Sequence, residues 1–302
     1  MTTNLFRLVL FFSFLFFSFQ NQSAQNNFLH FDGSDDYVTA PLPTVFDAIG
    51  STPHTIEAYV YVTNGNFKSV VYAQSSQSYL HVNMAINLGK VAYYVKTGNG
   101  PQFIKTYITN ELVPLNQWVH IAVTWGGSNN AQRVYINGVP ATQFLGSSSS
   151  STDINNTLTI GGIGSSASGR YNGLIDEVRI WDVARTEAEI LENMNVALTG
   201  SEANLVAYYN FNHGTCAEDN AGETTLTDLT GNYDGTLNNF ALDNCTSNWV
   251  CAGASCGYPD LPDASPAIPT LSQWGLIILA LLLMTAGTLY LVQPNVEEKL
   301  GR

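Results

Sequence analysis

Charged side chains are scarce in this sequence. Asp, Glu, Lys and Arg together make up 12% of the 302 residues, and Phe, Trp and Tyr make up another 12%. Disordered chains have the opposite composition, with many charges and few aromatic residues. The composition therefore indicates an ordered, β-rich protein, and the length is sufficient for one large sandwich domain with additional segments.

Basic residues are especially few. There are 11 Lys and Arg against 24 Asp and Glu, which gives a formal net charge of −13. An acidic surface repels phosphate backbones, so the sequence excludes nucleic acid as a partner. The same surface is suited to solubility and to the binding of divalent cations.

Motifs of catalytic sites are missing as well. The sequence has no Ser/His/Asp motif and no Gly-rich phosphate loop, and its five histidines lack metal-ligand spacing. Glycoside hydrolases need two carboxylates on one face of a sheet. Glu57 shares its expected strand face with Tyr59 and Tyr61, while Asp176 and Glu177 are adjacent and point to opposite faces. We therefore predict that the protein is not an enzyme.

Cysteine is limited to four residues, all within positions 216–256. An even number of cysteines in a secreted chain predicts two disulfide bonds. Three pairings are possible, and we predict Cys216 with Cys245 and Cys251 with Cys256. A zinc site is the alternative.

The N-terminus has the pattern of a secretory signal peptide. Arg7 precedes an apolar run over residues 8–19, and Ser23 and Ala24 form a small-residue cleavage site. We predict residues 1–24 as the signal peptide. A retained N-terminal anchor is the alternative, but the apolar run is short for a membrane span.

From residue 26 onward, short strands alternate with turns rich in Asn, Gly and Ser. In residues 118–125, Val119, Ile121, Val123 and Trp125 occupy one face. Asn137-Gly138 is a strong hairpin signal. The pattern predicts a sandwich or a barrel. The expected strands are residues 28–31, 37–38, 54–62, 69–73, 79–84, 91–95, 103–108, 118–125, 133–136 and 158–160.

Residues 173–192 are expected to form one strand followed by one short helix. Alternation places Leu174, Asp176, Val178 and Ile180 on one face of the strand, with Ile175, Glu177, Arg179 and Trp181 on the other. Thr186 and Glu189 have the spacing of a capping box at the start of the helix. Asp176 is unusual because a carboxylate on an apolar face needs a hydrogen-bond partner or a metal ion.

Several of these segments together resemble a known family. FDGSDDYV, HTIEAYVYV, WVHIAVTW, RVYINGV, LTIGG and GLIDEVRIWDVARTEAEI occur in this order over residues 26–196. This is similar to the laminin G-like, concanavalin A-like jelly-roll domains of bacterial surface proteins. The resemblance implies an all-β jelly-roll sandwich over residues 25–200, with residues 201–258 as a Cys-containing β extension of the same sandwich.

The resemblance also implies a structural calcium ion where the first and last strands meet. The matching positions are Asp32, in the FDG turn, and Asp176, in GLIDEV, with Asp35 and Asp36 nearby. Calcium binds several oxygen ligands at once, from carboxylates and backbone carbonyls. In the alternative, Asp176 accepts backbone hydrogen bonds and Asp32 only makes a turn.

The C-terminal part resembles an IPTL-type sorting signal, of the kind read by exosortases in Gram-negative bacteria. A Pro-rich linker over residues 259–267 precedes residues 268–302, which include a predicted transmembrane helix at 276–292. Glu297 and Glu298 depart from the family's basic tail, and a plain membrane anchor is the alternative. The sorting motif comprises Ile268, Pro269, Thr270, Leu271, Ser272, Gln273, Trp274 and Gly275.

Taken together, these features predict a secreted binding protein of the cell surface or extracellular matrix. One hypothesis is a module that binds a polysaccharide or surface glycan, with Tyr59 and Tyr61 as ligand-binding side chains on one sheet face. The other is an adhesin or matrix component that binds a surface protein without recognising sugar. Because relatives of the fold include glycoside hydrolases, that activity is a third alternative.

Overall fold

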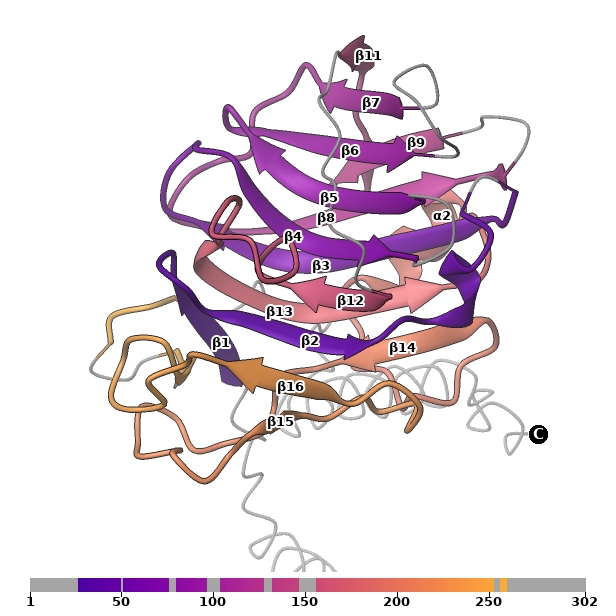
Figure 1. Ribbon diagram of the computed structural model, residues 1–302. Coiled ribbons are helices and arrows are strands. Elements are labelled where there is room, and N and C mark those ends of the chain that lie inside the picture. Colours follow the sequence, from indigo (N-terminus) through magenta and orange to yellow (C-terminus); the bar gives the residue numbers. More distant parts are fainter. Residues whose placement is uncertain are drawn as a thin grey trace, which may run out of the picture. The chain divides into compact units, whose positions relative to one another are not determined.

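Two antiparallel sheets pack face to face in the computed structural model, so the fold is the all-β sandwich that the sequence predicts (Figure 1). The structure describes residues 27–49, 51–75, 80–96, 104–127, 132–146, 156–252 and 256–259. Besides strands, these residues include the short 3-10 helix η2 (Thr44–Phe46) and the helix α2 (Glu187–Asn193).

One sheet has nine strands, and most of them are stacked from top to bottom in the foreground of Figure 1. Non-consecutive strands lie side by side, as expected for a jelly roll. In spatial order the strands are β11 (Gln143–Gly146), β7 (Ile104–Thr109), β6 (Lys90–Lys96), β5 (His81–Asn87), β4 (Lys68–Gln74), β12 (Thr157–Ile160), β2 (Tyr37–Pro41), β16 (Gly235–Asn238) and β15 (Thr225–Leu226).

The other sheet has eight strands. Seven of them are hydrogen-bonded to one another in a single continuous order, and β14 (Leu205–Tyr209) pairs with β13 outside that order. The spatial order of these seven strands is β10 (Val139–Pro140), β9 (Gln132–Ile136), β8 (Trp118–Trp125), β3 (His54–Val62), β13 (Asn172–Trp181), β1 (Asn27–Asp32) and β17 (Trp249–Cys251).

The core lies between the two sheets and follows the alternation of the sequence. Val119, Ile121, Val123 and Trp125 all point into it from β8, as predicted. Side chains of this kind contribute about 1.5–3 kcal/mol each when they are fully buried. The periodicity therefore fixes which face of each strand is internal.

The predicted hairpin at Asn137-Gly138 is confirmed. Both residues have positive φ, 50° and 74°, and Ile136 pairs with Val139 across the turn. Asn and Gly tolerate this left-handed backbone better than other residues. The turn therefore joins β9 directly to β10.

The predicted capping box is also present at the start of α2. Thr186 Oγ1 accepts a hydrogen bond from the backbone N–H of Glu189, and the Glu189 carboxylate accepts one from the backbone N–H of Thr186, at 2.7 Å. Ile190 is the buried residue of the helix and packs against Ala122 and Tyr135. Thus α2 covers the outer face of the eight-stranded sheet near β8 and β9.

The predicted alternation of β13 is wrong beyond Asp176. The pairing of β13 with β3 shifts its register between Asp176 and Arg179, and Glu177 has a φ of 53°. This β-bulge inserts an extra residue, so the faces exchange. Ile175, Val178 and Ile180 point into the core as a result, while Arg179 lies on the outer face.

Beneath α2, the outer face of the eight-stranded sheet contains a buried ionic network centred on Glu57. Arg185 Nη1 lies 3.5 Å and Arg179 Nη1 lies 3.9 Å from Glu57 Oε1, and His120 Nε2 lies 3.4 Å from Oε2. Trp181 Nε1 donates a hydrogen bond of 2.8 Å to Glu57 Oε1. Glu57 Oε1 therefore faces two guanidinium groups and an indole N–H.

These partners determine the protonation of Glu57. Burial alone would raise its pKa, but the contact with His120 and the charges of Arg179 and Arg185 lower the pKa to about 2. Arg179 also donates hydrogen bonds to the carbonyls of Asn193, at 2.7 Å, and Val196, at 2.8 Å. The network therefore fastens the end of α2 and the following segment to the sheet.

Residues 201–258 contribute strands to both sheets. In the eight-stranded sheet, β14 pairs with β13 and β17 pairs with β1, while β16 pairs with β2 in the other sheet. Four aromatic side chains of this segment are in the core or pack against a buried cluster, as expected from the sequence: Tyr208, Phe211, Phe240 and Trp249.

Other predictions concern residues that the structure does not describe. These are the signal peptide at 1–24, most of the linker at 259–267, and the sorting signal at 268–302 with its helix at 276–292. No helix among the described residues has the length and apolar character of a membrane span.

Replacement of Glu57 by Gln will destabilise the protein. The change leaves the buried Arg185 without its carboxylate partner, and removing one partner of a buried ion pair costs about 3–5 kcal/mol of unfolding free energy. The exposed Glu192→Gln is the matched control and should change stability by less than about 0.5 kcal/mol. Urea unfolding at pH 7 measures both values, and equal stability of the two variants would contradict a structural role for the network.

The pH dependence of the same variant has a defined sign. The folded-state pKa of Glu57, about 2, lies below the ordinary value of 4.5, so its stabilising effect is present above pH 4.5. That stabilisation is lost as the pH falls from 4.5 through 2. The stability difference between wild type and Glu57→Gln should therefore shrink over this range.

Candidate functional site

Tyr59 and Tyr61, the predicted ligand-binding residues, do not form an open binding face. Tyr59 is 3% exposed, and its hydroxyl donates a hydrogen bond to Asn195 Oδ1 in the segment after α2. Tyr61 is half-buried and packs edge-on against Trp118 and Tyr258. Alternation assigns both residues to one face of the sheet, as predicted, but it does not show what covers that face.

The predicted disulfide pairing is also wrong. The bonds join Cys216 to Cys251 and Cys245 to Cys256. The segment around Cys216 lies next to β17, which contains Cys251. The backbone N–H of Ala217 donates a hydrogen bond of 2.9 Å to the carbonyl of Trp249 in that strand. This tertiary contact leaves no trace in the spacing of the four cysteines.

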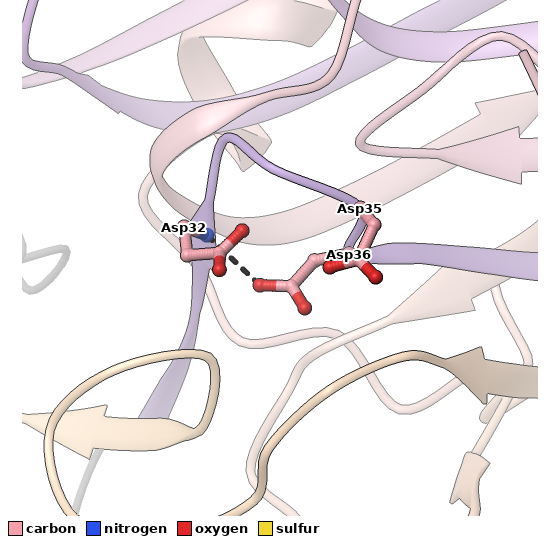
Figure 2. A group of neighbouring side chains, drawn as sticks. All are labelled: Asp32, Asp35 and Asp36. Atoms are coloured by element: carbon pink, nitrogen blue, oxygen red, sulfur yellow. Dashed lines mark hydrogen bonds between the residues drawn. The ribbon is translucent and has the colours of Figure 1, made fainter. Parts of the chain in front are cut away.

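Three of the four predicted calcium ligands do lie together, in the turn between β1 and β2 (Figure 2). Asp32, Asp35 and Asp36 each place a carboxylate oxygen within 4.8 Å of the others. Asp36 Oδ2 accepts the backbone N–H of Asp32 at 2.8 Å, and Asp36 Oδ1 accepts the Ser247 hydroxyl at 2.6 Å. The turn is thereby attached to the C-terminal extension.

The electrostatics of this turn favour a cation. Burial, assisted by the negative charges of Asp32 and Asp35, raises the pKa of Asp36 to about 6, although hydrogen bonds from Ser247 and the Asp32 backbone oppose the shift. A hard cation with oxygen ligands would relieve this repulsion, so the donor set fits calcium. Arg170 also lies near enough for Asp35 and Asp36 to raise its pKa, against the larger opposing effect of burial.

Asp176 is not part of this group. In the pairing of β1 with β13, Asp32 is opposite Asn172, and Asp176 lies four residues further along β13, at a distance of about 13 Å. Asp176 is fully buried, and its Oδ1 accepts the backbone N–H of Glu177 at 2.8 Å. The predicted link between Asp32 and Asp176 is therefore wrong, and the hydrogen-bonded alternative describes Asp176 better.

A second polar surface, which the sequence analysis missed, covers the outward face of the nine-stranded sheet. Strand pairing places eight side chains there in two adjacent rows, which we call the polar face. The first row is Thr159, Tyr72, Asn83, Tyr94 and Thr106, and the second row is Gln74, His81 and Lys96.

Most of the polar face is buried, although it lies on the side of the sheet away from the core. Apart from Tyr94, all of its side chains have exposed fractions of 5% or less. The hairpin of residues 161–171 lies in front of β4 in Figure 1, and Phe67 beside it contacts the Tyr94 ring with centroids 6.2 Å apart. The polar atoms are therefore largely removed from water.

Three of these buried polar atoms have no hydrogen-bond partner among the described residues. They are His81 Nδ1, Thr106 Oγ1 and Thr159 Oγ1. An unsatisfied buried polar group costs about 1–3 kcal/mol, so such groups are uncommon in folded proteins. Burial and the neighbouring Lys96 lower the pKa of His81 to about 4, which keeps the imidazole neutral and able both to donate and to accept.

One sequence signal could have revealed the polar face. In the strands around residues 69–74, 81–85 and 157–160, alternate positions are Thr, Asn, Gln, His and Tyr rather than charged residues. A solvent-exposed sheet face commonly includes Lys and Glu, so a face of neutral hydrogen-bonding groups is unusual. The register of the strands is what aligns these positions into rows.

Comparison with known proteins identifies the family. Residues 32–191, more than half of the chain, match the family described as the concanavalin A-like lectin/glucanases superfamily, a laminin G type. The chain belongs to this superfamily. A second match, to the IPTL-CTERM motif, covers residues 266–289 and marks the protein for export and surface sorting. No curated protein matches the sequence.

Among solved structures, one similar protein shares the fold. A "putative carbohydrate binding protein" from Bacteroides ovatus is 20% identical with a TM-score of 0.52, and the match covers 71% of this chain and 58% of that protein. The heptameric SAP-like pentraxin of Limulus polyphemus is 16% identical with a TM-score of 0.42 and coverages of 56% and 82%. At 20% identity, the likeness to the first structure concerns the fold alone.

The raised pKa of Asp36 predicts a pH-dependent stability in chelator. Its folded-state pKa, about 6, exceeds the ordinary value of 3.8, so the folded protein binds this proton more tightly. The stabilising effect is present below pH 3.8 and is lost as the pH rises through 6. Relative to Asp36→Asn, which cannot titrate, wild type should therefore be more stable at pH 5 than at pH 7.5. Urea unfolding at both pH values tests this, and a constant difference would contradict it.

Proposed function

We propose that this protein is a non-catalytic glycan-binding protein of the bacterial surface and that the polar face holds the glycan. The observation that carries the proposal is a set of three buried polar atoms, on His81, Thr106 and Thr159, that have no hydrogen-bond partner within the described part of the chain. A hydroxyl-rich ligand supplies both donors and acceptors, so it can satisfy all three atoms.

The dimensions of the polar face suit an extended ligand. Thr159 and Thr106 are at opposite ends of the first row, four strand spacings apart, which corresponds to about 19 Å. An oligosaccharide is long enough to cross these strands, whereas a single sugar is not. The description of the B. ovatus protein as carbohydrate-binding supports this function by analogy of fold.

The buried carboxylates support a binding role rather than hydrolysis. A glycosidase needs two accessible carboxylates, one of them with a raised pKa. Glu57 is fully buried, ion-paired and has a lowered pKa, while Glu177 accepts hydrogen bonds from Arg179 and Tyr208. Both carboxylates are engaged in stabilising the sheet.

The IPTL-type motif supports a specific route to the surface. In this proposal residues 1–24 direct export, the helix at 276–292 anchors the chain in the membrane of a Gram-negative bacterium, and an exosortase-like enzyme processes the motif at 268–275. The protein then remains at the surface or in the extracellular matrix. Two carboxylates near the end, Glu297 and Glu298, distinguish this tail from a compact basic one.

Calcium has a structural role in the proposal. Asp32, Asp35 and Asp36 would hold the ion with backbone carbonyls and water, and the ion would stiffen the turn between β1 and β2. Because Asp36 also binds Ser247, calcium would stabilise the attachment of the C-terminal extension.

The second candidate function, protein binding, is favoured by an exposed apolar turn. Leu88 is 80% exposed with a φ of 52°, and Leu112, 64% exposed, lies close to the neighbouring Gly89. A leucine in the left-handed conformation costs about 1–2 kcal/mol and gains nothing from burial here. Such a residue suits contact with an apolar partner surface.

Replacement of Thr159 by Val will separate binding from stability. Valine has the shape of threonine without the hydroxyl, and the Thr159 hydroxyl has no partner among residues that the structure describes, so its removal should leave the melting temperature unchanged or raise it. Glycan binding should fall by about tenfold, equivalent to one lost hydrogen bond of about 1.4 kcal/mol. A glycan array with the full chain in mild detergent identifies the ligand, and calorimetry then compares the variants.

The matched control is Thr225→Val, the same change at an exposed position of β15 in the same sheet. It should not affect glycan binding. Equal binding by Thr159→Val and wild type would place the ligand elsewhere. A blank array from folded protein would favour the protein-binding candidate instead, with Leu88→Asn as its first test.

Calcium should raise the melting temperature of the protein, and chelator should reverse the effect. Asp35 is exposed and its carboxylate is the least engaged of the three, so Asp35→Asn should abolish the calcium response while leaving stability in chelator unchanged. Asp182 is an exposed aspartate directly after β13. The variant Asp182→Asn is the control and should retain the calcium response. A calcium shift that survives in Asp35→Asn would exclude this turn as the site.

A further inference from the structure

Three leucines are exposed at one end of the sandwich, and we call this group the leucine end. Leu88, in the turn between β5 and β6, is 80% exposed, while Leu112 and Leu115, in the loop between β7 and β8, are 64% and 47% exposed. Leu88 also has a φ of 52°, which Asn or Gly adopts more easily, so backbone preference does not account for a leucine there. Exposed apolar side chains that gather in one place mark an interaction surface.

Hydrogen bonds between loops fix the backbone of the leucine end. The N–H of Gly89 donates to the carbonyl of Gly65 at 2.9 Å, and the carbonyl of Gly89 accepts the N–H of Val113 at 2.7 Å. The N–H of Asn116 donates at 2.8 Å to the carbonyl of Val62, the last residue of β3. Loops that follow strands of both sheets are thereby joined, so the exposure of the leucines is a property of the fold.

The C-terminal part of the chain leaves the sandwich beside the leucine end. Trp118 Nε1 donates a hydrogen bond of 2.9 Å to the carbonyl of Pro259, and Trp118 directly follows the loop that contains Leu115. The ring of Tyr258 packs against Tyr61, near the end of β3, with centroids 6.0 Å apart. Because Pro259 is the last described residue, the chain continues from this place toward its C-terminal apolar run.

The connection from Pro259 to the apolar run is short. Ile268, the first residue of the sorting motif, is nine residues beyond Pro259, and Leu276, the first residue of the apolar run, is 17 residues beyond it. That length of chain extends over at most about 60 Å, and its prolines make it semi-rigid. A short tether raises the effective concentration of the surface to which it is anchored, so weak apolar contacts with that surface become sufficient.

We infer that the leucine end docks on a lipid bilayer, with Leu88, Leu112 and Leu115 in contact with the boundary between headgroups and acyl chains. The inference rests on the proposed anchoring of residues 276–292 in a membrane and adds a second contact with that membrane. The departure of the chain at the same end favours lipid over a protein as the occupant. In this arrangement the strands end at the bilayer, and neither outer face of the sandwich lies against it.

The test uses the full chain reconstituted in phosphatidylcholine vesicles, with a fluorophore on Gln117→Cys. Gln117 is exposed beside the leucine end, and the four native cysteines form two disulfides, so the label goes to the new thiol. Phosphatidylcholine carries no net charge, which avoids repulsion of the acidic chain. Spin-labelled lipid should remove most of the emission. The same label on Ala48→Cys, an exposed position in the loop before β3, should keep its emission, because β3 begins at the opposite end of the sandwich.

Leu88→Asn should restore much of the emission at position 117, and it should fold because Asn tolerates the left-handed backbone. Leu191→Asn, at an exposed leucine of α2, is the matched control and should leave the quenching unchanged. Equal emission from positions 117 and 48, in protein that floats with the vesicles, would overturn the docking but leave the anchor intact. Quenching that persists in Leu88→Asn would overturn the role of the leucines, and protein that does not float would overturn the anchor and the docking together. The glycan array is independent of all these results.

Discussion

The eight-stranded sheet depends on the pairing of β13, because one edge of this strand is hydrogen-bonded to two different strands. Along that edge, residues 172–175 pair with β1 and residues 178–181 pair with β14, while the opposite edge pairs with β3. The bulge at Asp176 and Glu177 separates the two halves. It allows a strand from the beginning of the domain and one from the C-terminal extension to share one neighbour.

The bulge also determines which charged side chains of β13 lie on the outer face of the sheet. By reversing the alternation, it places Arg179 rather than Val178 on the outer face, beneath α2, where it meets Glu57 and Glu177. Buried charges of this kind contribute little net stability, but losing one partner is costly, so they favour one arrangement over others. The network therefore commits the outer face of the eight-stranded sheet to structure, with α2 held over it.

Local patterns in the sequence were sufficient for much of this fold. The alternation of residues 118–125, the turn at Asn137-Gly138 and the capping box at Thr186 each depend on neighbours a few positions away. The phase change in β13, the partners of Cys216 and the covering of Tyr59 depend on strands that are distant in sequence. Periodicity carries no information about these contacts, which is why the alternation of β13 and the pairing of Cys216 were predicted wrongly.

The candidate site shows the same division. Asp32, Asp35 and Asp36 are adjacent in sequence, so their grouping could be predicted, whereas the polar face assembles one or two residues from each of five strands. Its recognition required the register. The two outer faces differ in what contacts them. One is covered near β8 by α2 and carries Tyr258 and Pro259, the last described residues, against Tyr61 and Trp118. The other holds buried polar atoms without partners among the described residues, which is why the proposed glycan is placed there.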